Sequence, residues 1–367
     1  MNKKLNIALV FGGKSGEHEV SLQSAKSIYE AIDKERHNVS LIGIDKNGQW
    51  QLGNAANFLL NSNDPKLIKL NDQTSTAVIP RSTNNQIELY TLQDNQPTQQ
   101  IDVFFNIIHG STGEDGIIQG LFEMLGAAYV GAGVLGSAIG MDKEMMKRIF
   151  ISADLPVGEF AVIKKHELED IDWESIVKDR ELPLFVKPAN AGSSVGVSKA
   201  KTPKELRTAV YKAFEYDNKV LIEQYIKGRE IECSVLGNED PIASVCGEII
   251  PQHEFYSYEA KYIDENGAVL KIPAEIPAEK QKQIQDYAIK AFQILECRGM
   301  ARVDFFLTED NKIYLNEINT LPGFTKISMY PKLWEASGLP YAHLIDRLIS
   351  LAIQEKESKD KLKRTYT

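Results

Sequence analysis

The sequence predicts a chain of three consecutive α/β and α+β segments. Its 367 residues exceed what one hydrophobic core usually covers, so more than one domain is expected. A strand, a Gly-rich turn, a helix and a second strand follow one another near the N-terminus, which is typical of an α/β unit. Near the C-terminus two apolar runs flank the polar connection TEDNK, which is typical of a β-hairpin.

The composition excludes several classes of protein. A hydrophobic fraction of 43% is enough for packed cores, and a net charge of -9 argues against a nucleic-acid partner, because phosphate backbones favour clustered Lys and Arg. Cys233, Cys246 and Cys297 lack CxxC spacing, so neither a zinc site nor a disulfide framework is expected. We expect three buried thiols in a reducing compartment.

The start of the chain favours a cytoplasmic protein. Residues 5–11 form a short apolar run that ends in Gly-Gly, which fits a first buried strand better than an export signal. No apolar run reaches membrane-spanning length. A cytoplasmic protein without a membrane partner is therefore expected.

The first segment, residues 1–140, reads as an α/β domain. Strand candidates at 5–11 and 39–44 enclose a helix whose apolar residues recur at spacings of three, four and three. In such units the loop at the carboxyl end of the first strand usually carries ligands. The apolar residues of that helix are Leu22, Ala25, Tyr29 and Ile32.

A polar stretch, residues 45–100, interrupts this domain. It is rich in Asn, Gln, Ser and Thr, and its strand candidates are short, at 77–79 and 87–92. We interpret it as an insertion whose role the sequence does not reveal. The strand pattern resumes at Val103, and a loop and a helix follow.

The second segment, residues 141–224, opens with the helical run MDKEMMKRIF and contains the strand candidates PLFVKP, SVGVSKA and KVLIEQYI. Thr202, Pro203 and Glu205 supply an N-cap, a first-turn proline and an acid at the third position, which together mark a helix start. The apolar stripe of this helix is Leu206, Val210, Ala213 and Phe214.

The third segment, residues 225–367, contains the hairpin. Alternating Ile231, Cys233 and Val235 predict a half-buried strand before it. A helix is expected over 278–296, and a final helix follows the hairpin. The apolar residues of the final helix are Leu344, Ile345, Leu348 and Leu351.

The hairpin gathers charged side chains. Side chains repeat every two residues along a strand, so Arg302 shares a face with Asp304, and Glu317 with Asn319. If 309–312 form a four-residue loop, Asp304 lies opposite Glu317 and Arg302 opposite Asn319. A slip of one residue would undo this pairing.

Two carboxylates so close repel unless a cation bridges them. The oxygen-only ligand set favours Mg²⁺ or Mn²⁺ over zinc. The alternative is a salt-bridge cluster on a solvated sheet face. The hairpin taken by itself favours this cluster over a metal site.

A Gly-rich loop favours a phosphate-containing ligand, and with it a metal site, over the salt-bridge cluster. NAGSSVGVSKA follows Lys187 between two strands, and its glycines allow backbone N–H groups to approach phosphate oxygens. It lacks the ending of a Walker A loop, and a plain hairpin is the alternative. With Lys143 and Lys187 nearby, a nucleoside triphosphate becomes the ligand that explains most of these features.

Seven motifs in one order point to a family. They are SGEHEVS, HGSTGEDG, MDKEMMK, VKPANAGSSVGVSK, YSYEAKY, ARVDFF and NEINTLPGFTKIS. From the first strand to about Trp334 the chain resembles the D-alanine-D-alanine ligases, which are ATP-grasp enzymes. The resemblance implies a three-domain ATP-grasp fold with an N-terminal Rossmann-like domain at 1–140 and two grasp subdomains at 141–224 and 225–367.

The resemblance also implies an activity. Enzymes of this family join two D-alanines at the expense of ATP, through an acyl phosphate, and release ADP and phosphate for peptidoglycan precursor synthesis. Relatives are commonly homodimers. The alternatives are a D-alanine-D-lactate ligase, another ATP-grasp carboxylate-amine ligase, and a nucleotide-binding sensor without chemistry.

The resemblance assigns the metal and nucleotide residues. One set of residues would bind two Mg²⁺ or Mn²⁺ ions, and a second set would bind ATP. Within the second set, the lysines would contact the phosphates and the other residues would recognise adenine and ribose. The metal ligands would be Asp304, Glu317 and Asn319. The ATP-binding residues would be Lys143, Lys187, Ser194, Glu223, Gln224, Ile226, Glu230 and Lys261.

The amino-acid end of the site is assigned in the same way. Glu17 would pair with the ammonium of the first D-alanine and connect through Ser193 to Tyr262. Arg302 and the backbone N–H of Gly323 would form the oxyanion hole. Residues 250–277 would form a loop that closes over the site. The substrate-binding residues would be His109, Ser328 and Met329.

Overall fold

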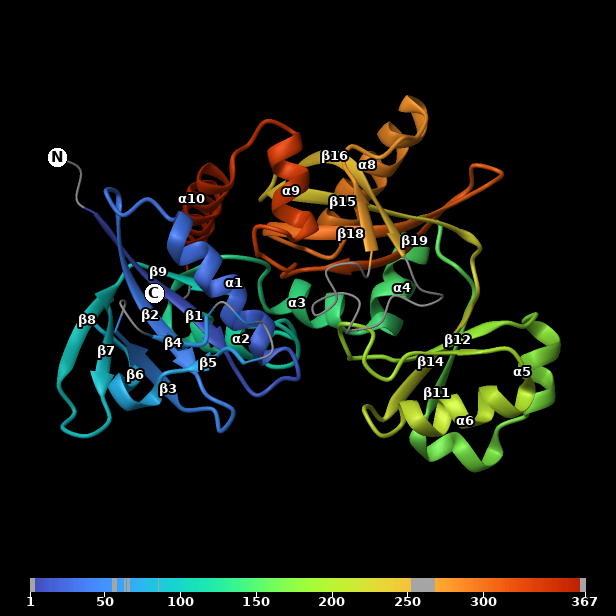
Figure 1. Cartoon of the computed structure of the whole chain (residues 1–367), viewed down its shortest axis with the longest axis horizontal. Coiled ribbons are helices and arrows are strands. Elements are labelled where there is room, and N and C mark those ends of the chain that lie inside the picture. The colour runs from blue at the N-terminus through green and yellow to red at the C-terminus, as the bar shows by residue number, and fades with distance from the viewer. Residues whose placement is uncertain are drawn as a thin grey trace.

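The computed structural model contains three larger β-sheets and a two-stranded sheet among the residues that it describes. Figure 1 shows an N-terminal part in blue and cyan, a small part in green and yellow, and a third part in yellow and orange. The described residues are 4–54, 58–62, 64, 67–84, 86–251 and 268–363.

The N-terminal sheet begins as predicted. Strand β1 (Leu5–Gly12) runs parallel to β2 (His37–Ile44), and helix α1 (His18–Ala31) connects them. On its other side β1 pairs in parallel with β9 (Val103–Asn106), which pairs with β10 (Ala128–Tyr129). The predicted strand-helix-strand unit is confirmed, and the turn after β1 lies at the carboxyl ends of these strands, where α/β folds bind ligands.

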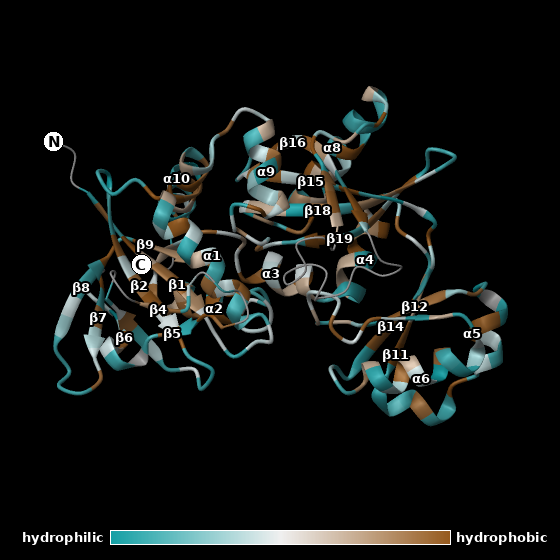
Figure 2. Cartoon of the chain, in the orientation of Figure 1, coloured by the Kyte–Doolittle hydropathy of each residue, from teal (hydrophilic) through white to brown (hydrophobic). Residues whose placement is uncertain are grey.

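The polar stretch extends the same sheet. Antiparallel strands continue it outward from β2, and the order is β10-β9-β1-β2-β3-β6-β7-β8. The sequence predicted two short strands here, whereas the structure has longer and additional ones. These strands bury few side chains, Val78 and Leu89 among them, and Figure 2 shows the outer strands as pale or teal. The elements of this stretch are β3 (Trp50–Gly53), β4 (Leu59–Leu60), β5 (Lys69–Leu70), η1 (Asp72–Thr74), β6 (Thr76–Thr83), β7 (Gln86–Thr91) and β8 (Pro97–Ile101).

Helices from both ends of the chain cover the N-terminal sheet. The last helix, α10 (Tyr341–Asp360), contributes Leu344 and Leu348 to one core with Leu9 of β1 and Leu22 of α1. The C-terminal helix therefore closes a face of the N-terminal sheet (Figure 1). Two further helices, α2 (Ile117–Leu125) and α3 (Val134–Met141), follow β9 and β10.

The second sheet is a small antiparallel one of order β11-β14-β12-β13. Helix α6 (Pro203–Ala213) packs Leu206 and Val210 against it. The predicted helix start is confirmed, because the Thr202 side chain accepts a hydrogen bond from the backbone N–H of Glu205. The other elements are β11 (Phe160–Lys164), η2 (Lys165–Asp170), α5 (Trp173–Asp179), β12 (Leu184–Pro188), β13 (Ser198–Ala200) and β14 (Lys219–Gln224).

The third sheet is antiparallel throughout, with the order β17-β16-β15-β18-β19. Helix α4 (Lys143–Ser152) packs Met146 and Phe150 into the core of this sheet together with α8. Cys233, Cys246 and Cys297 are buried and form no disulfide, as predicted. The elements are β15 (Gly228–Gly237), β16 (Ile242–Pro251), β17 (Ala268–Lys271), α8 (Ala278–Ile294), β18 (Gly299–Thr308), β19 (Ile313–Asn319) and α9 (Met329–Ala336).

The prediction of a half-buried β15 is wrong. Ile231, Cys233 and Val235 are buried, but so are Glu232 and Ser234 on the opposite face. Glu232 Oε2 lies 2.9 Å from Nε of an arginine on β18, and Ser234 Oγ donates to a carbonyl of α9. The polar alternation therefore reflects internal partners rather than exposure to solvent.

The hairpin pairing is confirmed, by a route that differs from the predicted one. Asp304 lies opposite Glu317, and Arg302 opposite Asn319. The ladder continues to Thr308, whose N–H donates to the carbonyl of Lys312, so the turn is one residue shorter than expected. A β-bulge between Leu315 and Glu317 restores the register.

Candidate active site

A cavity of about 440 Å³ lies between the second and third sheets. Side chains from both sheets line it, together with α4 and the Gly-rich loop after β12. It brings together residues that are far apart in the sequence and that were predicted to bind ATP or metal, together with Ser193, which was predicted to connect Glu17 to Tyr262. Those lining it are Lys143, Lys187, Ser193, Ser194, Glu223, Gln224, Ile226, Glu230, Asp304, Glu317 and Asn319.

A buried ionic cluster forms one wall of this cavity. Lys187 Nζ lies 2.8 Å from one oxygen of Glu223, and Lys147 Nζ lies 3.4 Å from the other. Burial by itself would raise the pKa of Glu223, but the two lysine charges outweigh it and hold that pKa at about 2. Burial lowers the pKa of Lys147. For Lys187, burial also favours the neutral amine, yet Glu223 and Glu317 raise its pKa above the usual value.

The third lysine connects the Gly-rich loop with the hairpin. Lys143 Nζ donates to the carbonyl of Ala191 at 2.8 Å and lies 3.9 Å from Glu317 Oε2. In the loop itself, Ser193 and Ser194 have φ values of 50° and 61°, which non-glycine residues adopt at an energetic cost that is common at functional sites. The cavity thus gathers cationic groups from α4 and β12, which suits a polyphosphate.

The carboxylate pair of the hairpin fits a divalent cation. Asp304 and Glu317 face each other across the ladder, and Asn319 Nδ2 lies 3.0 Å from Asp304 Oδ2. Within the described part of the chain, no group of three or more His, Cys, Asp or Glu side chains is arranged to hold a metal ion. Two carboxylates, an amide and substrate phosphates are the ligands that Mg²⁺ commonly takes, so the residues present fit this ion.

Arg302 lies between two acids. Its guanidinium donates to both oxygens of Asp304, at 2.8 and 2.7 Å, and its Nε lies 2.9 Å from Oε2 of the buried Glu232. This bidentate geometry fixes the plane of the guanidinium beside the carboxylate pair.

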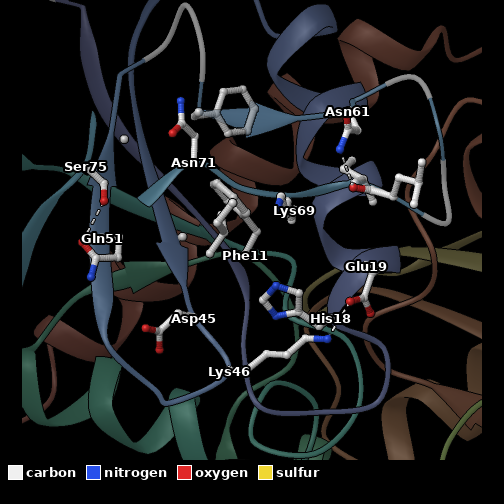
Figure 3. A pocket seen from close by; sticks show the side chains of 16 residues that line it. Phe11, His18, Glu19, Asp45, Lys46, Gln51, Asn61, Lys69, Asn71 and Ser75 are labelled. Carbon is white, nitrogen blue, oxygen red and sulfur yellow. Dashed lines mark hydrogen bonds and ion pairs between the residues drawn. The ribbon is translucent and has the colours of Figure 1, made fainter. Parts of the chain in front are cut away.

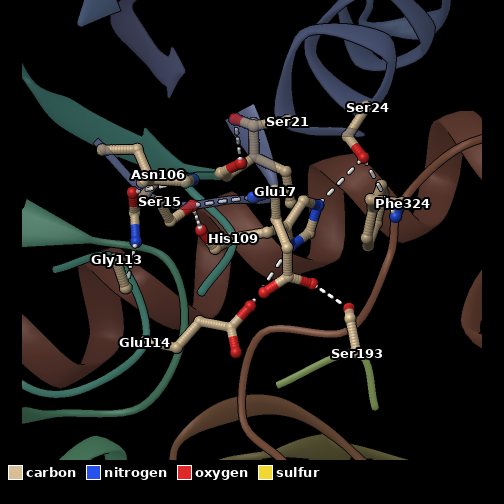
Figure 4. Close-up of polar contacts among 12 residues, drawn as sticks. Ser15, Glu17, Ser21, Ser24, Asn106, His109, Gly113, Glu114, Ser193 and Phe324 are labelled. Carbon is tan, nitrogen blue, oxygen red and sulfur yellow. Dashed lines mark hydrogen bonds and ion pairs between the residues drawn. The ribbon is translucent and has the colours of Figure 1, made fainter. Parts of the chain in front are cut away.

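Glu17 connects the N-terminal domain to the cavity. It follows the turn after β1, is 8% exposed, and its Oε1 accepts a hydrogen bond from Ser193 Oγ, as Figure 4 shows. The backbone comes close to its other oxygen at Gly110, where φ is +77° and a Cβ would lie 2.6 Å from Oε2. A side chain at that position would displace the carboxylate, so glycine is required there.

His109 lies in the same cluster and has partners at both ring nitrogens (Figure 4). Glu114 Oε1 lies 3.3 Å from His109 Nδ1, and a carboxylate oxygen can only accept, so in the neutral imidazole Nδ1 carries the proton. Nε2 then accepts from the Ser24 hydroxyl, 3.0 Å away, and Ser24 Oγ also accepts the backbone N–H of Phe324. Three segments of the chain therefore meet at one imidazole.

The loop after β19 carries the remaining predicted residues. At Gly323 a Cβ would lie 3.2 Å from Ser328 Oγ, so the loop is tight at this point. Ser328 precedes α9, and its Oγ accepts the backbone N–H of Thr325 at 3.0 Å. The Met329 side chain packs with Ile249 in a small core, so only its backbone could contact a substrate. Lys261 and Tyr262 lie outside the described residues, as does most of the predicted loop 250–277.

A second cavity, of about 510 Å³, lies in the N-terminal domain between α1, β2, β3 and the β4-β5 hairpin (Figure 3). Phe11 and Phe58 form its apolar part, and Lys46 donates to Glu19 at its rim. The residues predicted to bind substrates do not line it. Of its charged groups, Lys46 and Glu19 pair with each other, and Asp45 accepts hydrogen bonds from the backbone of its own turn.

Sequence reasoning missed three residues of the candidate site. Glu114 is part of the motif HGSTGEDG but received no role. Lys147 lies four residues after Lys143 on α4, a spacing that places both on one helix face. Asn316 precedes Glu317 and contacts Lys187, with its Oδ1 3.3 Å from Nζ. The helical spacing was a usable signal for Lys147, whereas the bulge at Asn316 left none.

Comparison with known proteins agrees with this geometry. The family described as D-ala D-ala ligase N-terminus matches residues 6–132, and the family described as D-ala D-ala ligase C-terminus matches residues 149–350. The chain belongs to the D-alanine-D-alanine ligase family.

Ligases of this family are similar to the chain over its whole length. The D-alanine-D-alanine ligase of Shouchella clausii is 55% identical over 361 residues, which cover 98% of each chain. D-alanine-D-alanine ligase A of Escherichia coli K12 is 51% identical over 99% of this chain and 100% of its own. The family is ATP-dependent and generally uses a divalent metal.

Solved structures of the family share the fold. The D-alanine-D-alanine ligase of Coxiella burnetii is 39% identical with a TM-score of 0.86, over 98% of this chain and 96% of that one. The VanG D-Ala:D-Ser ligase of Enterococcus faecalis is 34% identical with a TM-score of 0.83, over 95% and 100%. The predicted three-domain ATP-grasp fold is therefore confirmed. Among the described residues, no helix is long and apolar enough to cross a membrane.

Proposed function

We propose that the protein joins two D-alanine molecules to D-alanyl-D-alanine, with ATP converted to ADP and phosphate, as a step in peptidoglycan precursor synthesis. The observation that carries the proposal is the meeting of two groups of residues at Ser193. The lysines and the carboxylate pair surround one cavity, and Ser193, which lines that cavity, donates to Glu17 in the N-terminal domain. The proposed phosphate-binding and amino-acid-binding regions would therefore adjoin at Ser193.

The chain would hold ATP between its two antiparallel sheets. Lys143 and Lys187 would neutralise phosphate oxygens, and the Gly-rich loop with Ser194 would cover them. Adenine would lie against Gln224 and Ile226 at the end of β14, with Glu223 nearby. Glu230 on β15 would accept hydrogen bonds from the ribose hydroxyls. Lys261 is proposed to reach the γ-phosphate.

Two Mg²⁺ or Mn²⁺ ions would bind at the carboxylate pair. Asp304 and Glu317 would share one ion, and Glu317 with Asn319 would hold the second, with phosphate oxygens as further ligands. When bound, the ions would cancel charge on both sides of the transferred phosphoryl group.

The amino acids would bind on the side of Glu17. Its carboxylate would pair with the ammonium of the first D-alanine, and His109 would lie near the carboxylate of that substrate. Ser328 and the backbone of Met329 would bind the carboxylate of the second D-alanine. Arg302 and the N–H of Gly323 would stabilise the oxyanion that forms when its amine attacks the acyl phosphate. Tyr262 is proposed to complete the contact of Glu17 with Ser193.

A second candidate concerns the acceptor. The VanG enzyme, whose structure is similar to this chain, is named as a D-Ala:D-Ser ligase, and a D-alanine-D-lactate ligase was the alternative from the sequence. The intact YSYEAKY motif favours an amine acceptor within this family. Competition between D-alanine, D-serine and D-lactate in one reaction, followed by product mass, would distinguish the three.

The direct test of the proposal is turnover. With ATP and Mg²⁺, D-alanine is expected to release phosphate and yield a product with the mass of the dipeptide, whereas L-alanine is expected to yield neither. Phosphate release that does not depend on an amino acid would contradict the proposed reaction.

A homodimer in the cytoplasm is proposed as the working form. Cytoplasmic ATP and cell-wall precursors support the location. The apolar face of α2 and α3 supports the dimer, because Ile117 and Met124 are 62% and 88% exposed on α2, and Val134 and Leu135 are 41% and 58% exposed on α3. Such a face is usually covered by another protein surface.

Met124→Glu is expected to convert the dimer to a monomer. In a symmetric interface each copy would bury a new carboxylate, which is costly without a partner. Light scattering should give twice 41.1 kDa for the wild type and a mass near the monomer for the variant. Ile151→Glu on α4, at a position that is 52% exposed, is the matched control and should leave the mass unchanged. A wild-type monomer would overturn the dimer proposal.

A further inference from the structure

The bulge on β19 has an unusual set of partners. The ladder pairs Leu315 with Phe305 and Glu317 with Asp304, so Asn316 is the additional residue. In a bulge the carbonyl and N–H of the additional residue leave the ladder and need partners elsewhere. The carbonyl of Asn316 accepts a hydrogen bond from Lys147 Nζ at 3.1 Å.

The bulge decides which way Glu317 faces. Ile313 and Leu315 point into the core of the third sheet, and so does Ile318. Leu315 and Ile318 are an odd number of residues apart, so the apolar pattern requires one additional residue between them. With the bulge at Asn316, Glu317 points to the cavity instead of the core.

The Lys147 ammonium has a second partner besides the Asn316 carbonyl. Its side chain is 3% exposed, it comes from α4, and its ammonium lies between the Asn316 carbonyl and Glu223 Oε1. A buried ammonium needs such partners, because burial without them favours the neutral amine. Lys187 adds a second cation on the Asn316 side chain, 3.3 Å from its Oδ1. Two lysines on separate elements therefore hold one bulge residue.

We propose that Lys147 is a positioning residue for the metal ligand Glu317, which it orients by holding the carbonyl of the preceding residue, Asn316. The proposal rests on the proposed metal site. Lys147 touches neither of the two carboxylates of that site in the described contacts, and it acts through the backbone. Partners of this kind typically change metal affinity about 10- to 100-fold when they are removed.

The test measures Mn²⁺ binding without turnover. The full-length protein with saturating ADP is titrated with Mn²⁺, and free Mn²⁺ is followed by electron paramagnetic resonance. Lys147→Met is expected to weaken Mn²⁺ binding about tenfold or more, and Lys147→Arg is expected to show a smaller loss. Arg148→Met is the matched control, since Arg148 is the next residue on α4 and its side chain is 58% exposed. It should bind Mn²⁺ like the wild type.

A second measurement separates the metal from the nucleotide. The affinity for ADP in the presence of a chelator reports the contact of Lys147 with Glu223, and it should fall less than the affinity for Mn²⁺. Asn316→Ala keeps the carbonyl and loses only the amide, so it should weaken Mn²⁺ binding less than Lys147→Met does.

Three outcomes would overturn the inference. Equal Mn²⁺ affinity of Lys147→Met and the wild type would do so, and so would an equally large loss of ADP affinity without metal. If Lys147→Met does not fold by circular dichroism, wild-type Mn²⁺ affinity of Lys147→Arg would have the same meaning. Failure of the wild-type protein with ADP to bind Mn²⁺ would instead overturn the proposed metal site, and with it this role of Lys147.

Discussion

Glu317→Gln is expected to lower kcat by about a thousandfold or more, because a cation at this site supplies several kcal/mol of charge stabilisation to phosphoryl transfer. Glutamine has nearly the same shape but no charge, so the hairpin and its bulge should remain in place. Glu317 lies opposite Asp304, and removing one carboxylate leaves a single acid to hold the cation. Phosphate release with ATP and D-alanine measures the effect.

The matched control for this variant lies in the same hairpin. Glu309 is in the turn, and its side chain is 85% exposed. Glu309→Gln should keep the activity of the wild type. Near-normal turnover of Glu317→Gln at saturating Mg²⁺ would show that Glu317 is not a metal ligand.

Arg302→Ala is expected to reduce dipeptide formation about 100- to 1,000-fold, as the loss of one oxyanion donor typically does. ADP should still bind, because the lysines of the cavity are separate from Arg302. The variant should also lose stability, by about 3 kcal/mol, since removing one partner of a buried ion pair leaves a carboxylate uncompensated. In this case the carboxylate is Glu232, which is 5% exposed.

Two further variants separate catalysis from stability. Arg302→Lys retains a charge near Glu232 but loses the planar fork that spans both oxygens of Asp304, so it should fold better than Arg302→Ala and remain slow. Arg298→Ala removes the ion pairs with Glu296 and Glu355 and should change urea unfolding without a large change in kcat. An Arg302→Ala variant with normal kcat would refute the oxyanion role.

The chemistry-bearing parts of the site could be predicted because they are local. The two carboxylates of the hairpin lie on neighbouring strands that a short turn connects. The hairpin pattern and the period of a strand together predict that they share a face. The helix start at Thr202 was equally readable from three adjacent residues. The position of Glu17 against Ser193 was available only from the resemblance to a family, because no local rule connects the N-terminal turn with a loop of the second sheet.

Other features depend on contacts that no local pattern encodes. The polar stretch 45–100 contains Asn, Gln, Ser and Thr where strands usually have apolar alternation, because its strands extend a sheet edge and bury few side chains. β15 appeared half-buried because Glu232 and Ser234 alternate with apolar residues, and their partners on β18 and α9 are distant in sequence. The bulge at Asn316 compensates for a short turn, so the predicted pairing was correct although the predicted loop was not.

The pair of hydrogen bonds from Arg302 to Asp304 has a consequence for the order in which substrates bind. Asp304 accepts hydrogen bonds from the guanidinium with both of its oxygens, and a divalent ion would compete for the same lone pairs. We expect binding of the metal-nucleotide complex to weaken these hydrogen bonds, so that the guanidinium can turn toward the acceptor amino acid. The acceptor D-alanine would then bind productively only after the metal-nucleotide complex, and initial-rate kinetics should show that order.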